Sequence, residues 1–128
     1  MASSTVGIVC IRQIAINVHD LERATAFYRD VLALPFLFSA GSIAFFDCGG
    51  VRLMLTRPEN AEQDHPSSIL YFAVADINAS YYRLVGNNVV FEDTPHLIAK
   101  MPDHDLWMVH FHDSEQNLLS LMSEVSRA

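Results

Sequence analysis

Hydrophobic and polar residues alternate near the start of the chain and then change to a helical spacing. Apolar side chains occupy every second position from Ile14 to Val18, which predicts a strand over about 10–18 with one apolar face. Asp20 then stands where a helix N-cap belongs, because its short carboxylate accepts hydrogen bonds from free backbone N–H groups. The apolar residues that follow recur every three or four positions. They predict a helix over 21–32 that packs on the apolar face of the strand.

Three short apolar runs follow this helix, and turn residues separate them. The runs predict three strands, over residues 36–39, 42–48 and 51–57. Gly49 and Gly50 supply a tight hairpin between the last two strands, because glycine accepts a positive φ without steric cost. Residues 58–67 carry charge and proline without apolar periodicity, so we expect a linker there.

The same order of elements then begins again. The residues V-A-D-I at 74–77 repeat V-H-D-L at 18–21, and Asp76 takes the N-cap position. The pattern predicts a helix over 77–84 and strands over 68–74, 89–92, 97–101, 106–112 and 118–123. The chain is therefore a βαβββ unit written twice. We expect a lead-in at 1–9, a first unit at 10–57, a linker at 58–67, a second unit at 68–124 and a tail at 125–128.

Two such units predict an α+β fold, with curved mixed sheets around a cleft and helices on the outside. One face of each sheet is left open, so the cleft forms either within one chain or across a homodimer. The period of two predicts which side chains lie on the open faces: Gln13, Ala15, Asn17, Met54, Ile69, Tyr71, Ala73, Leu118, Ser120 and Met122. It predicts that an opposite set packs on the helices: Ile14, Ile16, Leu70, Phe72, Leu119 and Leu121. A register slip of one residue would exchange the two sets.

Composition narrows the class of protein. A chain of 128 residues that is 51% hydrophobic suits one domain with a sizeable core. The net charge of −7 disfavours nucleic acid and anionic membranes as partners, because both need clustered Lys and Arg. The sequence contains neither a long apolar run typical of a membrane span nor a signal-peptide pattern. We therefore expect a cytoplasmic protein in which Cys10 and Cys48 are reduced thiols.

Two motifs carry a resemblance to a known family. The motifs V-x-D-L-x-x-A-x-x-F-Y at 18–28 and F-x-D-x-x-x-N-L at 111–118, set in tandem βαβββ units, resemble the vicinal oxygen chelate superfamily. That superfamily includes glyoxalase I, bleomycin-resistance proteins, fosfomycin-resistance proteins and extradiol dioxygenases. The resemblance covers about 11–124. It implies the fold more closely than the reaction, because this fold hosts many chemistries.

The resemblance also implies where a metal would bind. Enzymes of the family hold a divalent metal with His, Glu or Gln side chains on the open sheet faces. The matching positions of this chain are Gln13, Met54, Ile69 and Ser120. Of these, Gln13 alone keeps an oxygen ligand that the family uses, whereas a catalytic site needs about three strong protein ligands. The resemblance therefore implies a cleft without metal, as in bleomycin-resistance-like members, which bind a drug in the same grooves.

The last turn departs from the family pattern. Members usually read Asp-Pro-Asp-Gly-Asn there, whereas residues 113–117 of this chain read Asp-Ser-Glu-Gln-Asn. Glycine accepts a left-handed backbone, and Gln116 in the same geometry would cost about 1 kcal/mol. Asn117 is the expected alternative for the left-handed position.

A pair of histidines offers a metal site at another place. His110 and His112 stand at i and i+2, so both project from one face of a strand, roughly 7 Å apart. With His96 or His104, or with Gln13, they form a candidate site for a relocated divalent metal. The alternative is that both are half-exposed strand histidines without a metal.

His96 is the candidate for acid–base chemistry. Next to Asp103 or Asp105 it could act as a general base near neutral pH, and otherwise it closes a strand edge. Tyr71 and Trp107 are candidates to stack on a flat ligand, although aromatic residues also fill cores.

The first functional hypothesis is a homodimer that binds a small aromatic or amphipathic molecule in a metal-free cleft. The expected ligand-binding residues are Gln13, Asn17, Met54, Ile69, Tyr71, Trp107, Ser120 and Met122. One alternative is a metal-dependent lyase or dioxygenase that uses the relocated metal site. A second alternative is a metal-independent isomerase or lyase with His96 as its base.

Overall fold

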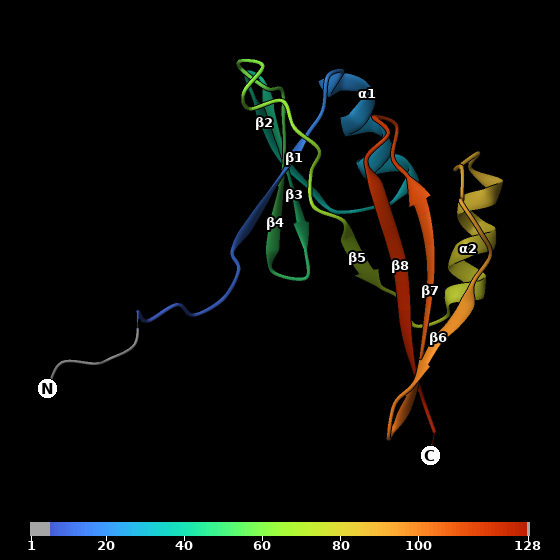
Figure 1. Ribbon diagram of the computed structural model, residues 1–128. Helices are drawn as coiled ribbons and strands as arrows, with labels where there is room; N and C mark the ends of the chain where they lie inside the picture. Colours follow the sequence, from blue (N-terminus) through green and yellow to red (C-terminus); the bar gives the residue numbers. More distant parts are fainter. Residues whose placement is uncertain (1–5, 128) are drawn as a thin grey trace, which may run out of the picture.

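The computed structural model describes residues 6–127, and its elements follow the predicted order. Two four-stranded sheets stand next to each other (Figure 1). The N-terminal sheet, in the order β1-β4-β3-β2, contains β1 (Gln13–Asn17), β2 (Phe36–Ala40), β3 (Ile43–Cys48) and β4 (Val51–Thr56). The C-terminal sheet, in the order β5-β8-β7-β6, contains β5 (Leu70–Ala73), β6 (His96–Lys100), β7 (His104–His112) and β8 (Leu118–Ser126). This is the predicted α+β tandem of βαβββ units, with β1 parallel to β4 and β5 parallel to β8.

The first strand of each unit leads into a helix through a capping aspartate, as predicted. The helix α1 (Leu21–Ala26) follows Asp20, whose carboxylate accepts a hydrogen bond from the Arg23 backbone N–H at 2.9 Å. The helix α2 (Ile77–Gly86) follows Asp76, whose carboxylate accepts one from the Ala79 N–H at 3.1 Å. Figure 1 shows α1 near the junction of the two sheets and α2 along the outer side of the C-terminal sheet.

The first helix is not the single α-helix that was predicted over 21–32. Its α-helical part ends at Ala26, and η1 (Phe27–Val31) is one wide π-helical turn. Within this turn the Leu32 N–H donates to the Phe27 carbonyl at 3.0 Å, and Tyr28 is fully buried. Apolar spacing does not distinguish the two kinds of turn over so short a stretch, because both bury one side of the helix.

The strand predicted over 89–92 is wrong. That segment makes one isolated bridge, between Phe91 and Phe111, and the chain bends directly after it. The first strand is also shorter than the predicted 10–18, because its pairing with β4 begins at Gln13. Residues 6–11 have no partner strand, and the apolar side chains from Val6 to Val9 are 84–91% exposed.

The helix-facing sides of both sheets share one core. Its largest fully buried side chains come from both units: Tyr28, Phe46, Phe111, Ile16, Leu53, Leu55 and Leu119. The predicted alternation is confirmed here, because Leu53 and Leu55 are buried on the helix side while Met54 between them points the other way. No helix within residues 6–127 has the length and apolar character needed to cross a membrane.

A polar turn ties the two units together. Residues 113–117, here called the junction turn, connect β7 to β8 and reach across to α1. The Glu115 side chain is 1% exposed, and its Oε1 accepts hydrogen bonds from the backbone N–H groups of His19 and Asp20, both at 2.9 Å. Its Oε2 accepts one from Arg23 Nε at 2.7 Å. Burial raises the pKa of Glu115, but the Arg23 bond and the two backbone donors outweigh it and hold that pKa below its usual range.

Asp113 holds the junction turn from inside the core. Its carboxylate accepts hydrogen bonds from the Tyr28 hydroxyl at 2.7 Å and from the Glu115 backbone N–H at 2.7 Å. Burial, together with the charge of Asp113, raises the pKa of Tyr28 well above its usual value. The first helix of the chain is therefore fixed to a turn 85 residues away in sequence.

The left-handed position of the junction turn belongs to Gln116, whose φ is 68°. The expectation that Asn117 would take this position is wrong. The Asn117 side chain is used instead to join the units, since its Nδ2 donates to the Asn17 carbonyl at 3.0 Å and to Asp113 at 2.9 Å.

Candidate functional site

Each sheet has one face that no helix covers, and the two together are called here the open faces. On the N-terminal sheet, the strand register aligns Gln13 with Arg52 and Ala15 with Met54. Phe45 pairs with Met54 from β3 and therefore shares this face. Tyr71, Ser120 and His110 form a corresponding row across the C-terminal sheet.

The N-terminal open face contains a cluster of three contacting side chains. Arg52 Nε donates a hydrogen bond to Gln13 Oε1 at 2.7 Å. The Arg52 guanidinium carbon also lies 5.4 Å from the centre of the Phe45 ring, a distance typical of cation–π contact. Gln13 Nε2 approaches Met54 Sδ at 3.7 Å, so both ends of the Gln13 amide already have partners. Gln13 is held as part of this cluster.

An apolar wall continues from this cluster. The rings of Phe38 and Phe45 pack with their centroids 4.7 Å apart, and they come from the paired strands β2 and β3. Phe45 is buried, although it lies outside the shared core, because its neighbours on the open face cover it. Sequence reasoning missed Arg52 and Phe45. The available signal was parity, since Arg52 is two residues from Met54, which was assigned to this face.

Ser120 lies on the open face but is not available to a ligand. It is 0% exposed, and its Oγ contacts the backbone carbonyls of Val109 and Leu121, each at 3.1 Å. Its two cross-strand neighbours, Tyr71 and His110, meet above it edge to face at 5.9 Å. The hydroxyl is therefore satisfied by the protein, and the exposed surface at this point is the Tyr71–His110 pair.

A second row on the C-terminal open face combines thioether and imidazole groups. His96 pairs with Met108, Met108 pairs with Met122, and Met122 pairs with Ala73, in four adjacent strands. His96 Nδ1 lies 2.9 Å from the Thr94 carbonyl oxygen, which can only accept. Nδ1 therefore carries a proton, and in the neutral imidazole Nε2 is the nitrogen with the lone pair. The nearest carboxylate to His96 is that of Asp93, at 3.6 Å.

The carboxylates first suggested as partners of His96 have other contacts. Asp103 pairs with His104 at 2.7 Å, and Asp105 pairs with Arg127. Trp107 is on the helix-covered side of β7, where it faces Ser123 in the register and packs against the shared core. Trp107, which was expected among the ligand-binding residues, therefore lies on the opposite side of the sheet from the open face.

Asn17 is engaged in holding the linker. Its Nδ2 donates to the Gln63 carbonyl at 2.9 Å and to the His65 carbonyl at 2.8 Å. The Asn17 backbone N–H donates to Ser67 Oγ at 2.9 Å. The Asn17 side chain thus fixes the path of the linker at the end of β1.

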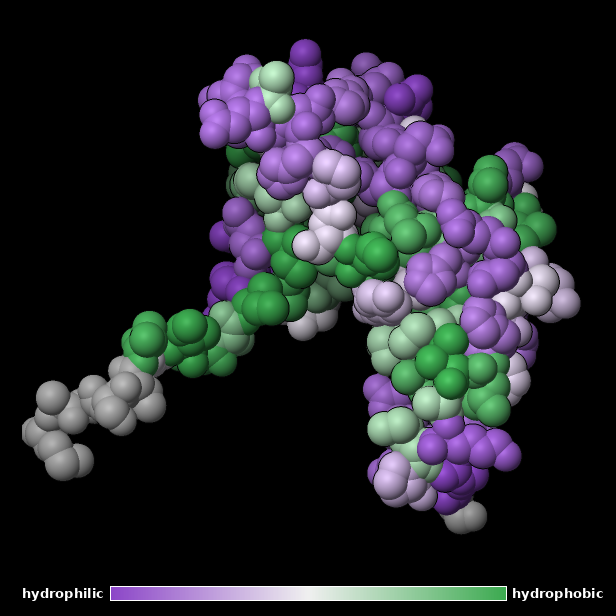
Figure 2. All heavy atoms as spheres, viewed as in Figure 1, coloured by the Kyte–Doolittle hydropathy of each residue, from purple (hydrophilic) through white to green (hydrophobic). Residues whose placement is uncertain are grey.

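The open faces form an exposed surface in one chain. Tyr71 is 45% exposed and Ile69 is 41% exposed, which is unusual for large apolar side chains next to one another. Figure 2 shows a hollow between the two sheets, with hydrophobic residues along its border. A ligand bound here would contact mostly carbon and sulfur, with a few polar groups at fixed positions.

The residues present do not fit the metal that the resemblance implies. Gln13 Oε1 accepts from a guanidinium, whose positive charge opposes a second cation at the same oxygen. Met54 and Ser120 offer a thioether and a satisfied hydroxyl. The alternative ligands are also engaged: His112 Nε2 lies 3.3 Å from Glu92, and His110 packs on Tyr71. Within residues 6–127, no three His, Cys, Asp or Glu side chains lie close enough to hold a metal ion.

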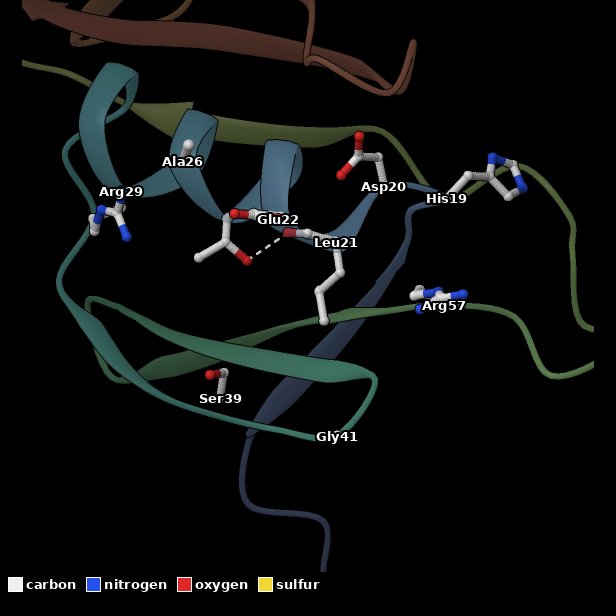
Figure 3. Close-up of a pocket in the computed structure, with 10 residues that line it drawn as sticks. His19, Asp20, Leu21, Glu22, Ala26, Arg29, Ser39, Gly41 and Arg57 are labelled. Carbon is white, nitrogen blue, oxygen red and sulfur yellow. Dashed lines mark hydrogen bonds between the residues drawn. The ribbon is translucent and has the colours of Figure 1, made fainter.

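A separate pocket of about 760 Å³ lies on the helix side of the N-terminal sheet (Figure 3). Figure 3 shows Leu21 reaching from α1 toward the β2–β3 hairpin, with Ser39 and Arg57 at the border of the pocket. Sequence reasoning missed this pocket. It arises from the spacing between a helix and a hairpin, for which the sequence contains no local signal.

Comparison with known proteins agrees with this architecture. Residues 11–121 match the family model of the glyoxalase/bleomycin resistance protein/dioxygenase superfamily. The metallothiol transferase FosB of Lysinibacillus sphaericus (strain C3-41) is 33% identical over 67 residues. The match spans 52% of this chain and 45% of that protein, which is less than half its length.

Solved structures resemble the whole chain. Lactoylglutathione lyase from Agrobacterium tumefaciens superposes with a TM-score of 0.69 and 23% identity, over 91% of this chain and 95% of that one. A glyoxalase/bleomycin resistance protein/dioxygenase from Nocardioides gives 0.74 and 20% identity, over 98% and 89% of the two chains. A superfamily member from Sphaerobacter thermophilus DSM 20745 gives 0.76 and 20% identity, over 91% and 98%. At sequence identities this low, the similarity to these structures shows a shared fold and nothing about function.

Proposed function

The chain belongs to the glyoxalase/bleomycin resistance protein/dioxygenase superfamily, and from that premise we propose that it binds a small aromatic or amphipathic organic molecule on its open faces, without a metal. The observation that carries the proposal is the chemistry of these faces. Aromatic rings and thioethers line much of them, and the polar groups Gln13 and Arg52 are held in position by each other. Such a surface favours a flat or amphipathic ligand.

The name of one relative points to a metal, since that protein is a metallothiol transferase. Against a metal in this chain stand the four family positions, which hold an occupied amide, a thioether, an isoleucine and a buried hydroxyl. Zinc and similar ions need about three strong ligands, and these residues supply fewer. We therefore propose binding that is indifferent to metal removal.

Titration with the fluorescent probe N-phenyl-1-naphthylamine tests the proposal. We expect saturable binding that is unchanged after the protein is stripped with a chelator. Met54→Lys places a charge in the apolar wall, so it should weaken binding at least about tenfold. Val85→Lys on α2, a position 45% exposed on the outside of the C-terminal unit, is the matched control and should bind normally.

Two results would contradict the proposal. One is the lack of saturable probe binding by the folded wild-type protein. The other is loss of binding on chelation with recovery on addition of zinc, nickel, iron or manganese, which would favour the metal-dependent lyase or dioxygenase.

A second candidate function rests on His96, whose Nδ1 is directed at the Thr94 carbonyl, so that Nε2 is the basic nitrogen of the neutral imidazole. Through Met108, its cross-strand neighbour, it borders the same open face. A general base beside the binding surface suits an isomerase or lyase that needs no metal. This role predicts a chelator-insensitive reaction that His96→Gln abolishes while probe binding is retained.

A further inference from the structure

The N-terminal open face carries a cation in a fixed orientation. Arg52 is held by two contacts of different kinds, the Nε bond to Gln13 at 2.7 Å and the stacking over Phe45 at 5.4 Å. A long side chain that is fixed in this way loses less rotamer entropy when a ligand binds to it. The guanidinium is thus oriented in advance on the surface proposed for ligand binding.

Within residues 6–127, the outer edge of this guanidinium, its two terminal nitrogens, has no protein acceptor. Gln13 occupies Nε, and no Asp or Glu within residues 6–127 lies within 4 Å of Arg52. Asp47 faces Arg52 in the strand register, but its carboxylate is turned to the hairpin, where it accepts from the Gly50 N–H at 3.3 Å. The two terminal nitrogens of Arg52 therefore remain free to donate to an anion.

The surroundings of this edge are apolar. Met54 lies next to Gln13, and Phe45 continues into Phe38. A carboxylate, sulfonate or phosphate accepts two parallel hydrogen bonds from an arginine, and this geometry discriminates better than a single lysine contact. The local positive charge is notable in a chain of net charge −7, because it makes this point attractive to an anion that the rest of the surface repels.

We propose that the ligand is an organic anion with a flat apolar body, bound with its charged group on Arg52 and its body over Phe45, Phe38 and Met54. The proposal rests on the proposed function and narrows its ligand class. Gln13, the position at which relatives carry a metal ligand, here serves as a positioning residue for Arg52.

A pair of probes with the same aromatic body tests the proposal. 1-Anilinonaphthalene-8-sulfonate is N-phenyl-1-naphthylamine with an added sulfonate, so their difference isolates the charged group. Arg52→Gln should weaken binding of the sulfonate about tenfold and change binding of the neutral probe less than about twofold. Arg52→Lys should recover part of the lost sulfonate affinity, because lysine keeps the positive charge but cannot donate two parallel hydrogen bonds.

Two further variants sharpen the test. Gln13→Glu places a carboxylate on the Arg52 Nε, so it should lower affinity for the sulfonate about as much as Arg52→Gln while sparing the neutral probe. Arg83→Gln on α2 removes one positive charge from the far side of the C-terminal sheet, and it should leave both affinities unchanged. Thermal unfolding of each variant establishes that the fold is retained.

The failures are distinguishable. If neither probe binds the wild-type protein, the proposed function fails and this inference with it. If the neutral probe binds but Arg52→Gln and Gln13→Glu leave the sulfonate affinity unchanged, the function stands and the anion site is wrong. If Arg83→Gln weakens the sulfonate as strongly as Arg52→Gln, the effect is one of net charge, and the anion site is again overturned.

Discussion

Gln116 shows, for a single residue, how much an unfavourable backbone conformation affects the free energy of unfolding. It has a φ of 68° in the junction turn, a region that disfavours side chains with a Cβ by about 1 kcal/mol. Gln116→Gly should therefore raise the free energy of unfolding by about 1 kcal/mol. Gln116→Ala keeps the Cβ and should leave stability nearly unchanged. Urea unfolding of the three proteins measures both effects, and an equal gain in the alanine variant would contradict the backbone explanation.

Residues whose role depends on adjacent sequence were predicted, and residues whose role depends on distant contacts were not. Asp20 and Asp76 cap their helices as predicted, because a cap needs only the next three residues. Ser120 was correctly assigned to the open face, but its burial results from Tyr71 and His110 on neighbouring strands. The alternation along one strand predicts the face on which a side chain lies, but not whether side chains of the neighbouring strands cover it.

The start of α1 and the junction turn form one structural element. The Glu115 carboxylate supplies acceptors for two N–H groups at the entry of the helix and for Arg23. Glu115→Ala removes all three bonds and should lower the free energy of unfolding by about 2 kcal/mol. Glu115→Gln retains an acceptor for the two N–H groups but loses the charge, so its loss should be smaller. Urea unfolding at neutral pH measures the difference between them.

The same carboxylate predicts a pH dependence. Because the folded pKa of Glu115 lies below its ordinary value of 4.5, its charge stabilises the fold above that pH. This contribution is lost as the pH falls through the folded pKa. The stability difference between wild type and Glu115→Gln should therefore shrink as the pH is lowered below about 4.5. A difference that stays constant over this range would contradict the assignment.

At the scale of elements, the repeated pattern predicted the strand and helix order well and predicted their ends poorly. The strand expected over 89–92 failed because an apolar run does not reveal whether a partner strand continues beside it. The π-helical turn of η1 was missed for a related reason. The wide turn contains the core-buried Tyr28, whose hydroxyl donates a hydrogen bond to Asp113 of the other unit.

At the scale of the whole molecule, large apolar side chains remain exposed on the open faces. The open faces carry Phe38, Ile69 and Tyr71 at 41–51% exposure. We expect a homodimer that covers these faces, and sedimentation velocity at micromolar concentration should detect it. Tyr71→Glu should shift the equilibrium toward monomer, whereas Val85→Glu on the outer helix should not. A wild-type protein that sediments as a monomer throughout this range would contradict the expectation.

The fold of the whole chain was predictable because two copies of one pattern must pack alike, and 111 residues match one family model accordingly. For the candidate site, the sequence predicted which face of each sheet is open, but not which side chains contact one another there. Its chemistry depends on pairs such as Gln13 and Arg52, which lie 39 residues apart and meet only through the strand register.

The bond between Glu115 and the entry of α1 has a consequence for synthesis on the ribosome. The backbone N–H groups of His19 and Asp20, just before α1, lack their acceptor until residue 115, more than 90 positions later, has left the exit tunnel. The amino-terminal half therefore emerges with its first helix incompletely bonded.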